Sequence, residues 1–453
     1  MKIVCWSVLF CLLIAGAAFA QAPEAVIPAR LSLDEALRIA EQRSPAMASA
    51  RAVVAMASAD QVRARTRPNP AFTFNSEGYG SNTQPGFLDS QELSLRVDQE
   101  IERGGRLRLR AESADAGRHS AQASLEDQRR RLSLDVRRVY FQLVLARADQ
   151  DTARASLDEM DKVIAVNRTR LEQGEISGGE MRRLQVERLR FMDDVFNAEL
   201  AARNTRSALL ALMNAPRLDI DVEPTETLAA PGTPASNPAE AGSHISTAAG
   251  PAFVTTVISG SGIGDQGGVP SISRDLAALT RDALAGRADL AAAREDEARA
   301  DSETRLQRAL RAPNPTVGGG YKRDFGESGV IFGVTVPLPI FDRNAGGVAR
   351  AEAERQLAAS RVAATEVVVA LDVQQALNAV EVNRARVAYI EKEHLQNARE
   401  ARDIVLASYS AGAIDLTDFL DAQRAFRETQ RTYNRALYDY RISLFELDAA
   451  LGK

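Results

Sequence analysis

The chain has 453 residues, a formal net charge of −5 at pH 7 and only 5% aromatic residues. This composition favours long helices over a thick globular core, and a mildly acidic chain is a poor candidate for binding nucleic acid. Its two cysteines, Cys5 and Cys11, both lie within residues 1–20, so the remaining sequence offers no thiolate for a disulfide, a metal or nucleophilic catalysis.

Residues 1–20 have the pattern of a secretory signal peptide. Lys2 precedes an apolar run that ends at Ala18-Phe19-Ala20, which is a small-x-small cleavage site. The alternative, a membrane anchor, is less favoured because the run falls short of the about 20 residues that a spanning helix needs. No later stretch is long and apolar enough to predict a further membrane helix.

Residues 31–214 are predicted to form a first structural repeat that begins with two helices. Ser44-Pro45 separates a helix that starts at Leu33 from a second helix that runs to about Arg67. Pro68-Asn69-Pro70 then stops the second helix, because proline provides no amide hydrogen for the helical ladder.

A strand hairpin is predicted at about residues 70–101. Apolar and polar residues alternate at 72–75 and again at 93–98, on either side of a glycine- and proline-rich turn at 78–86. Each arm is about 10 residues long, which is the length that a tilted strand needs to cross a bilayer. Taken alone, the pattern also fits a soluble hairpin.

A long antiparallel helical pair is predicted at residues 105–213. Steps of three and four residues from Leu132 to Leu171 land almost only on apolar residues, and the same spacing returns from Met181 to Leu212 after a glycine-containing turn. Such a seam is typical of a coiled coil. At about 1.5 Å per residue, its first helix is roughly 100 Å long, far beyond the size of a compact domain.

The order of elements then repeats. Residues 215–272 lack periodicity and predict a linker or an equatorial belt, and residues 273–452 form the second structural repeat. We expect a helix at about 274–311, a strand hairpin at about 315–340 and a long helical pair at 347–451, of which the first helix reaches Tyr409. The second hairpin follows Pro313-Asn314-Pro315, which matches the segment before the first hairpin.

One chain supplies only four candidate strands, whereas a membrane barrel needs about eight or more to close without an exposed edge. Three copies supply twelve strands and twelve long helices. The predicted fold is therefore mostly α with a membrane β-barrel. A duplicated unit of β-hairpin plus long antiparallel helical pair would assemble into a trimeric 12-stranded barrel that is continued by a 12-helix periplasmic tube.

The sequence carries no motif for catalysis or for a cofactor. We find no phosphate-binding glycine loop, no nucleophile elbow and no cluster of metal ligands. The three histidines, His119, His244 and His394, are isolated in the sequence and are better explained as surface residues than as metal ligands. The chain is therefore predicted not to be an enzyme and to have neither a cofactor nor a metal site.

Several short motifs resemble those of the TolC-like outer membrane efflux factors. The motifs, besides the two Pro-Asn-Pro segments, are Glu100-Ile101-Glu102-Arg103-Gly104-Gly105-Arg106, Val336-Pro337-Leu338-Pro339-Ile340-Phe341-Asp342-Arg343-Asn344 and Tyr433-Asn434-Arg435-Ala436-Leu437-Tyr438-Asp439-Tyr440-Arg441. Their order carries the resemblance, which covers nearly all of residues 31–452 apart from the linker. The glycine-containing strand exits look most like those of the cobalt-zinc-cadmium (CzcC-like) heavy-metal branch.

This resemblance implies a homotrimeric channel in the bacterial outer membrane that extends into the periplasm. Such a channel is the passive exit duct of a tripartite efflux system, and it contacts a periplasmic adaptor protein, an inner-membrane proton-driven pump of the resistance-nodulation-division type and outer membrane lipid. Divalent heavy-metal cations are the expected cargo. Multidrug or solvent efflux and protein secretion remain alternatives for the same duct, and a non-pore secreted coiled-coil scaffold remains an alternative of another class.

The turns at the ends of the two helical pairs are the expected docking site for the adaptor. An exposed glycine turn between antiparallel helices leaves a surface that another helical hairpin can complete. The alternative is that the glycines only permit a positive φ where the helices end. The expected docking residues are Gly174, Ile176, Ser177, Gly412 and Ile414.

Carboxylates next to these turns are expected at the periplasmic entrance. Asp418 and Asp421 are three residues apart, so both project from one helix face. The resemblance implies that three copies arrange them into acidic rings at the mouth of the duct, with Glu180 as a weaker counterpart in the first repeat. Such rings favour the passage of cations. A solvated acidic turn without a gating role is the alternative.

Overall fold

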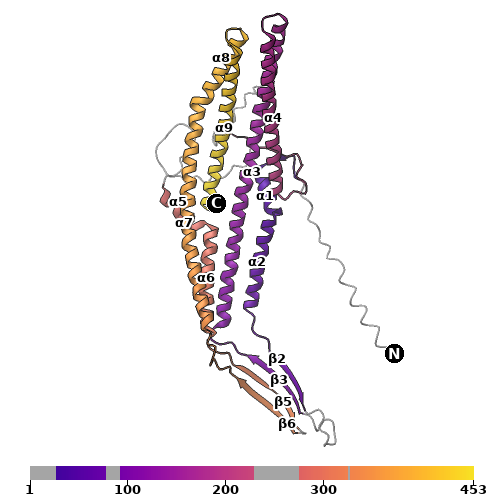
Figure 1. Ribbon diagram of the computed structural model, residues 1–453. Coiled ribbons are helices and arrows are strands. Elements are labelled where there is room, and N and C mark those ends of the chain that lie inside the picture. The colour runs from indigo at the N-terminus through magenta and orange to yellow at the C-terminus, as the bar shows by residue number, and fades with distance from the viewer. Residues whose placement is uncertain (1–26, 78–91, 229–274, 325–326) are drawn as a thin grey trace, which may run out of the picture.

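The computed structural model describes residues 27–77, 92–228, 275–324 and 327–453. Over these residues the molecule is elongated (Figure 1). A small sheet lies at one end, long helices follow, and at the other end two tight turns each connect a pair of antiparallel helices. The expected signal peptide at 1–20, the hairpin turn at 78–86 and most of the linker at 215–272 lie outside the described residues. No described helix is both long and apolar enough to cross a membrane.

Two short helices open the first repeat. Helix α1 (Leu33–Arg43) is capped by Ser32, whose Oγ accepts a hydrogen bond from the Glu35 amide at 3.3 Å. Helix α2 (Pro45–Ala64) begins with a proline directly after Ser44. Proline is well suited to this first position, because the amide hydrogen that it lacks would have no partner within the helix.

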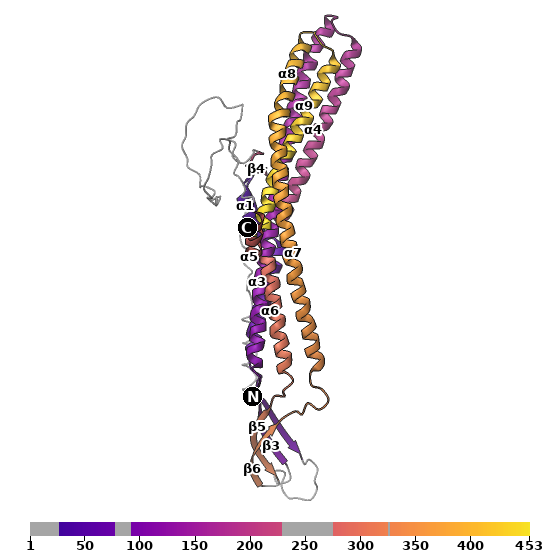
Figure 2. The ribbon, with the colours of Figure 1, turned by 90° about the vertical axis from the view of Figure 1, so that its left-hand side faces the viewer.

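The long antiparallel pair consists of α3 (Arg106–Glu172) and α4 (Gly178–Leu212), which lie side by side in Figures 1 and 2. Helix α3 has 67 residues, which corresponds to about 100 Å. Residues along the predicted seam, such as Val136, Met160 and Leu184, are at most 1% exposed. Burial of this seam holds the two helices together.

The second repeat begins with two helices instead of the single helix that was expected over residues 274–311. Helix α5 (Leu276–Gly286) and helix α6 (Ala288–Ala309) are separated by Arg287, whose backbone is extended (φ −74°, ψ 127°). The Arg287 side chain is buried and lies 2.6 Å from Asp289 and 2.7 Å from Asp372. The expectation of one helix was wrong because this ion-paired arginine takes the place that Ser44 has in the first repeat.

The helix expected to reach Tyr409 is also interrupted. Helix α7 (Ala345–Tyr389) passes into a π-helical segment (Ile390–Leu395), and α8 (Gln396–Ser410) follows. Eighteen residues make about five α-helical turns, so a regular helix that buries Ile390 would bury Ser408. The structure instead buries Tyr409, and the wider π turn takes up the one extra residue. Helix α9 (Leu416–Ala450) then returns along this path.

Four strands form one antiparallel sheet in the order β2-β3-β5-β6. They are β2 (Ala71–Glu77), β3 (Glu92–Glu100), β5 (Thr316–Asp324) and β6 (Glu327–Thr335). Phe74 lies opposite Leu95, and Leu95 opposite Tyr321, so apolar residues of the two repeats share one face. Phe74 and Phe332 on this face are 56% and 76% exposed.

The helices that adjoin the sheet follow the same order as the strands. Helix α2 packs on α3, α3 on α6 and α6 on α7 (Figure 1). Strand β2 follows α2 in the chain, and β6 precedes α7. One flank of the protein therefore consists of α2 and β2, and the other consists of α7 and β6. Along these flanks, β2 and β6 each have one side without a strand partner in the described part of the chain.

The middle asparagine of the second Pro-Asn-Pro segment ties the sheet to the helices. Asn314 Nδ2 donates to Glu100 Oε1 at 2.7 Å, and its Oδ1 accepts from the Arg103 amide at 3.1 Å. The buried Arg106 then donates to the carbonyl oxygen of Ala309 at 3.2 Å and to that of Ala312. Two of the motifs on which the resemblance rested, residues 100–106 and Pro313-Asn314-Pro315, thus form one junction between the two repeats.

Candidate functional site

The turns at the ends of the two helical pairs have the same backbone geometry. Gly174 and Gly412 have φ values of +77° and +75°. In each turn the amide that follows the glycine donates to the carbonyl oxygen five residues earlier, at 2.9 Å. This is the Schellman pattern, in which a left-handed residue ends a helix. Any side chain would be strained at this φ, so both turns depend on glycine.

The residues after each glycine start the returning helix. Ser177 Oγ accepts from the amide of Glu180 at 3.1 Å, and Asp415 Oδ1 accepts from the amide of the next residue at 2.6 Å. Ile176 and Ile414 precede these caps, are half-buried and pack on the apolar cluster inside the tips. This is the position of a hydrophobic staple. Both isoleucines therefore contribute to the structure of the tips.

The two helical pairs form one bundle at the tips, and Tyr409 lies at its centre. The Tyr409 ring stacks on Phe419 with 5.1 Å between centroids, and its hydroxyl donates to Asn167 Oδ1 at 3.1 Å. Arg170 donates to the Tyr409 carbonyl oxygen at 3.4 Å. Burial, with the charge of Glu180 adding to it, raises the pKa of Tyr409. These contacts join α3 and α4 to α8 and α9.

The carboxylates expected at the entrance lie on both tips but in different surroundings. Asp418 and Asp421 are exposed near the start of α9, whereas Glu180 is half-buried in the first turn of α4. Arg424 lies 3.3 Å from Asp421. This arginine offsets part of the negative charge of Asp421. Of the two aspartates, Asp418 is therefore expected to contribute more negative charge to its surroundings.

A charge network between α4 and α9, centred on the buried Glu187, was missed from the sequence. Glu187 is only 5% exposed and lies 2.8 Å from Arg424 and 2.9 Å from Arg190. Further from the tip, Asp194 lies 3.1 Å from Arg431. Glu187 is three residues after Leu184 on the α4 seam. A carboxylate that follows an apolar seam residue at a helical spacing of three is expected to be partly buried. This spacing is the signal that could have revealed the network.

The polar face of the sheet carries a second set of charges. Arg96 Nε lies 2.7 Å from Asp98 Oδ1, and a Cβ atom on Gly318 would overlap this carboxylate. Towards the far end of the sheet, the register aligns four carboxylates from four strands, with Lys322 between two of them. The four are Glu77, Glu92, Asp324 and Glu327. Sequence reasoning missed this row because it depends on the pairing of β3 with β5.

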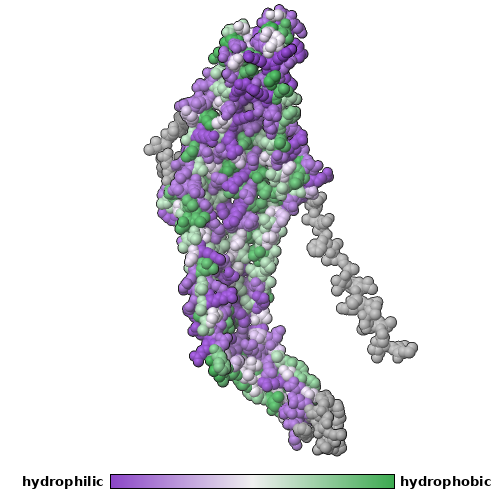
Figure 3. Space-filling view, viewed as in Figure 1, coloured by the Kyte–Doolittle hydropathy of each residue, from purple (hydrophilic) through white to green (hydrophobic). Residues whose placement is uncertain are grey.

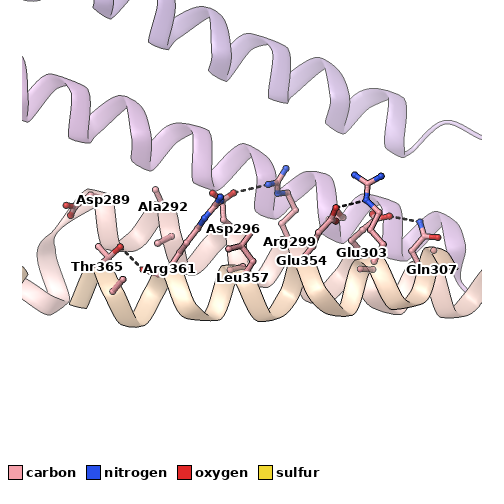
Figure 4. Close-up of a pocket in the computed structure, with 18 residues that line it drawn as sticks. Asp289, Ala292, Asp296, Arg299, Glu303, Gln307, Glu354, Leu357, Arg361 and Thr365 are labelled. Atoms are coloured by element: carbon pink, nitrogen blue, oxygen red, sulfur yellow. Dashed lines mark hydrogen bonds and ion pairs between the residues drawn. The ribbon is translucent and has the colours of Figure 1, made fainter. Parts of the chain in front are cut away.

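A groove of about 890 Å³ lies between α6 and α7, with α3 beside it (Figure 4). Its charged side chains pair with one another: Asp296 lies 3.4 Å from Arg299, and Glu354 lies 2.8 Å from Arg350. The opposite charges offset each other along the groove. The groove therefore lacks the concentrated charge of one sign that would attract an ion.

The histidines lie apart from one another. His119 Nδ1 is 3.7 Å from Glu295, and the His394 ring contacts Tyr389 with 4.8 Å between centroids. His244 lies outside the described residues. Across the described ranges, no three His, Cys, Asp or Glu side chains are placed to hold a metal ion.

Comparisons with known proteins agree on one family. The family model described as "Outer membrane efflux protein" matches residues 36–215 and 279–453. The chain is 24% identical over 426 residues to the cobalt-zinc-cadmium resistance protein CzcC of Cupriavidus metallidurans, covering 93% of this chain and 90% of that protein. Among solved structures, the outer membrane protein VceC of Vibrio cholerae has a TM-score of 0.70 at 20% identity, over 93% of this chain and 96% of that chain. The Neisseria gonorrhoeae MtrE outer membrane channel has a TM-score of 0.69 at 19% identity, over 93% and 88%.

Proposed function

The chain belongs to the outer membrane efflux protein family, and on this basis we propose that it is the duct through which a tripartite system expels divalent heavy-metal cations. It is an efflux channel of the outer membrane that extends into the periplasm, and it is not an enzyme. In the proposed system, an inner-membrane proton-driven pump of the resistance-nodulation-division type delivers the cation through a periplasmic adaptor. The similarity to CzcC over 93% of the chain carries the choice of cargo.

The proposed channel is a closed homotrimer. The main support is that one chain forms a four-stranded sheet whose edges β2 and β6 lie on opposite flanks. If β6 of one copy pairs with β2 of the next, three copies close a ring of about twelve strands and leave no edge. The same step brings α7 of one copy beside α2 of the next, which continues the barrel as a helical tube.

The flanks carry the apolar side chains that such contacts need. Exposed apolar residues on α2 and α4 belong to one flank, and exposed apolar residues on α7 and α8 belong to the other. They are Val53, Met56, Val62, Val186, Leu189, Phe196 and Leu200 on the first flank, and Leu357, Val367, Val368, Leu371 and Ile404 on the second. Side chains of this kind would be covered in a trimer, which supports the closed form over a single chain in solution.

The tips are the proposed docking site for the adaptor. Gly174, Ser177 and Gly412 are exposed at the end of the molecule. Close to the turns, a depression of about 350 Å³ lies between α3 and α8. It is lined by Glu159, Lys162, Val163, Val166, Asn167, Arg170, Leu406, Tyr409 and Ser410. A depression between two helices whose lining combines apolar side chains with charged ones suits the side chains of an amphipathic partner helix. Ile176 and Ile414 pack partly against the inside of the tips. We therefore propose that they maintain the shape of the docking surface.

Variants of Val166 test the docking proposal without disturbing the staples. Val166 is 54% exposed, so V166E should leave trimers intact but reduce both adaptor crosslinking and efflux, because a carboxylate in the depression resists burial by the partner. The matched variant V166T should keep both. Normal crosslinking and efflux with V166E would place the docking site elsewhere.

Gene deletion tests the cargo. Loss of the gene should increase the sensitivity of cells to zinc, cobalt and cadmium ions and leave their sensitivity to antibiotics and solvents unchanged, with the wild-type gene restoring resistance. If deletion left metal tolerance unchanged but increased the sensitivity to drugs or solvents, the cargo would be drugs or solvents and not heavy-metal cations. A protein that fractionates with the soluble periplasm would contradict the duct itself.

A further inference from the structure

The connection from β6 to α7 is a highly exposed apolar segment, and no intramolecular packing explains why its side chains are apolar. Between Val336 and Phe341 it contains Leu338 and Ile340, which are 74% and 64% exposed, and Phe341 is 100% exposed. Figure 3 shows hydrophobic surface gathered where the helices meet the sheet. We refer to residues 336–341 as the exit loop.

The exit loop continues the apolar face of β6. Val330, Phe332 and Val334 alternate along the strand, and the same period of two extends through Val336, Leu338 and Ile340 after the strand has ended at Thr335. No charged residue occurs from Ser328 to Phe341, and Asp342-Arg343 follows immediately. The apolar stripe thus ends at an abrupt charged boundary, several residues beyond the sheet.

The first repeat shows that the crossing from sheet to helix does not require such a loop. The equivalent connection from β3 to α3 covers only residues 101–105, whereas the connection from β6 to α7 covers residues 336–344. The shorter one contains Glu102 and Arg103, and its Ile101 is 46% exposed. The added length and the apolar character are therefore specific to the second repeat.

The backbone of the exit loop also suits an environment without water. Pro337 and Pro339 have no amide hydrogen, and the amide of Ile340 donates to the Leu338 carbonyl oxygen at 2.9 Å. Three of the six residues in the exit loop therefore have no unpaired backbone amide hydrogen. In hydrocarbon an unpaired amide is costly, so irregular backbone is tolerated there only when few such donors remain.

From these observations we propose that the exit loop inserts into the inner leaflet of the outer membrane, so that the membrane boundary of the second repeat lies at Phe341 and not at the end of β6. This inference rests on the proposed placement of the sheet in that membrane. The occupant of the apolar surface is lipid hydrocarbon, because the stripe is continuous with the face of the sheet that the proposed barrel turns to lipid. Asp342 and Arg343 then lie at the level of the headgroups.

Depth-dependent fluorescence quenching tests the proposal. Single-cysteine variants F341C, F332C and R103C of the full chain would be labelled with an environment-sensitive dye and reconstituted as trimers into phosphatidylcholine vesicles that contain lipids brominated at shallow or deep acyl positions. Phe341 is fully exposed within its own chain, so F341C removes no intramolecular packing. Ile101 is level with Val336 in the sheet register, so the control is the exposed Arg103, closer to the helix in the charged connection of the first repeat.

The F341C label should lose most of its emission to the shallow brominated lipid and little to aqueous iodide, whereas the R103C label should show the reverse. A label on F341C that iodide quenches, while brominated lipid quenches F332C, would place the loop in water and overturn the proposal. Shielding of F341C from both quenchers would assign the loop to a contact with a neighbouring copy and would also overturn it. If brominated lipid failed to quench F332C, the placement of the sheet itself would be contradicted.

Discussion

Two glycines with positive φ let the long helices of this chain reverse within a few residues. The sequence located both glycines, because a glycine that interrupts a regular seam is a strong local signal. It did not reveal that Ile176 and Ile414 are half-buried staples, since an isoleucine beside a turn fits a docking surface and a staple equally well. At the residue scale, the backbone of the site was thus more predictable than the surroundings of its side chains.

Alanine at Gly174 and Gly412 should loosen the tips. A left-handed φ costs a residue with a Cβ atom about 1–2 kcal/mol, so G174A and G412A should speed amide hydrogen exchange at the tips and leave that of the sheet unchanged. G178A is the control, because Gly178 lies in the first turn of α4, has no positive φ and has open space around it. Equal exchange in G174A and G178A would contradict the role assigned to the turn.

A half-buried aspartate, Asp149, makes stability depend on pH in a predictable direction. Burial raises the pKa of Asp149, although the hydrogen bond from Asn434 and nearby arginines oppose the shift. A carboxyl whose pKa is raised in the folded state favours folding while it is protonated, and this contribution is lost as the pH rises from the ordinary carboxyl range through the raised value. D149N should therefore unfold at a higher temperature than the wild type at neutral pH.

The difference between D149N and the wild type should shrink as the pH falls below the ordinary aspartate range, because Asp149 is then protonated in both states. D151N is the matched control, since Asp151 is exposed on the same helix and carries the same charge. Thermal unfolding followed by circular dichroism at several pH values measures all three proteins. A lower midpoint for D149N at neutral pH would contradict the assignment.

At the scale of elements, regular periodicity was the reliable guide and its interruptions were not. Helix α3 begins at Arg106, one residue after the expected start, and it runs unbroken to Glu172, as its regular apolar seam predicted. The breaks at Arg287 and at Ile390–Leu395 depend instead on distant partners, such as Asp372 for Arg287. The pairing of β3 with β5 could not be predicted from the sequence either. The alternation of apolar and polar residues identifies a strand but does not show which strand of the other repeat pairs with it.

The π-helical segment offers a test of register. Deleting Lys392, which is exposed, should convert the segment into regular α-helix and rotate α8 by about 100° relative to α9. Tyr409 would then leave its contacts with Asn167 and Phe419. Hydrogen exchange should rise at the tips and stay unchanged in the sheet, whereas K392A should behave as the wild type. Normal protection at the tips in the deletion variant would show that the extra residue does not set the register.

At the scale of the whole molecule, the proposed rings at the mouth should control ion selectivity. In the proposed trimer, three copies would bring Asp418 and Asp421 together at the mouth. Removal of these charges by D418N/D421N should lower the preference for cations over anions in single-channel recordings and weaken block by trivalent cations. D418N should have the larger single effect, because Arg424 already lies 3.3 Å from Asp421. Unchanged selectivity and block in the double variant would leave the two aspartates as a solvated acidic turn.

In the proposed trimer, three open sheets close through contacts between β6 of one copy and β2 of the next, and disulfide crosslinking can detect these contacts. Thr73 on β2 and Gly329, Ile331 and Gly333 on β6 alternate onto the polar face, and the only native cysteines lie within residues 1–20. Within one chain, β2 and β6 are separated by three strand spacings, about 14 Å, which is too far for a disulfide.

Any crosslink between T73C and a cysteine on β6 must therefore join two copies. Oxidation of T73C combined in turn with G329C, I331C and G333C should give, for the pair in the correct register, a covalent trimer as the largest product in outer membrane extracts, and reducing agent should return it to single chains. Absence of product with all three pairs, or a product that stops at dimers, would contradict the closed trimer.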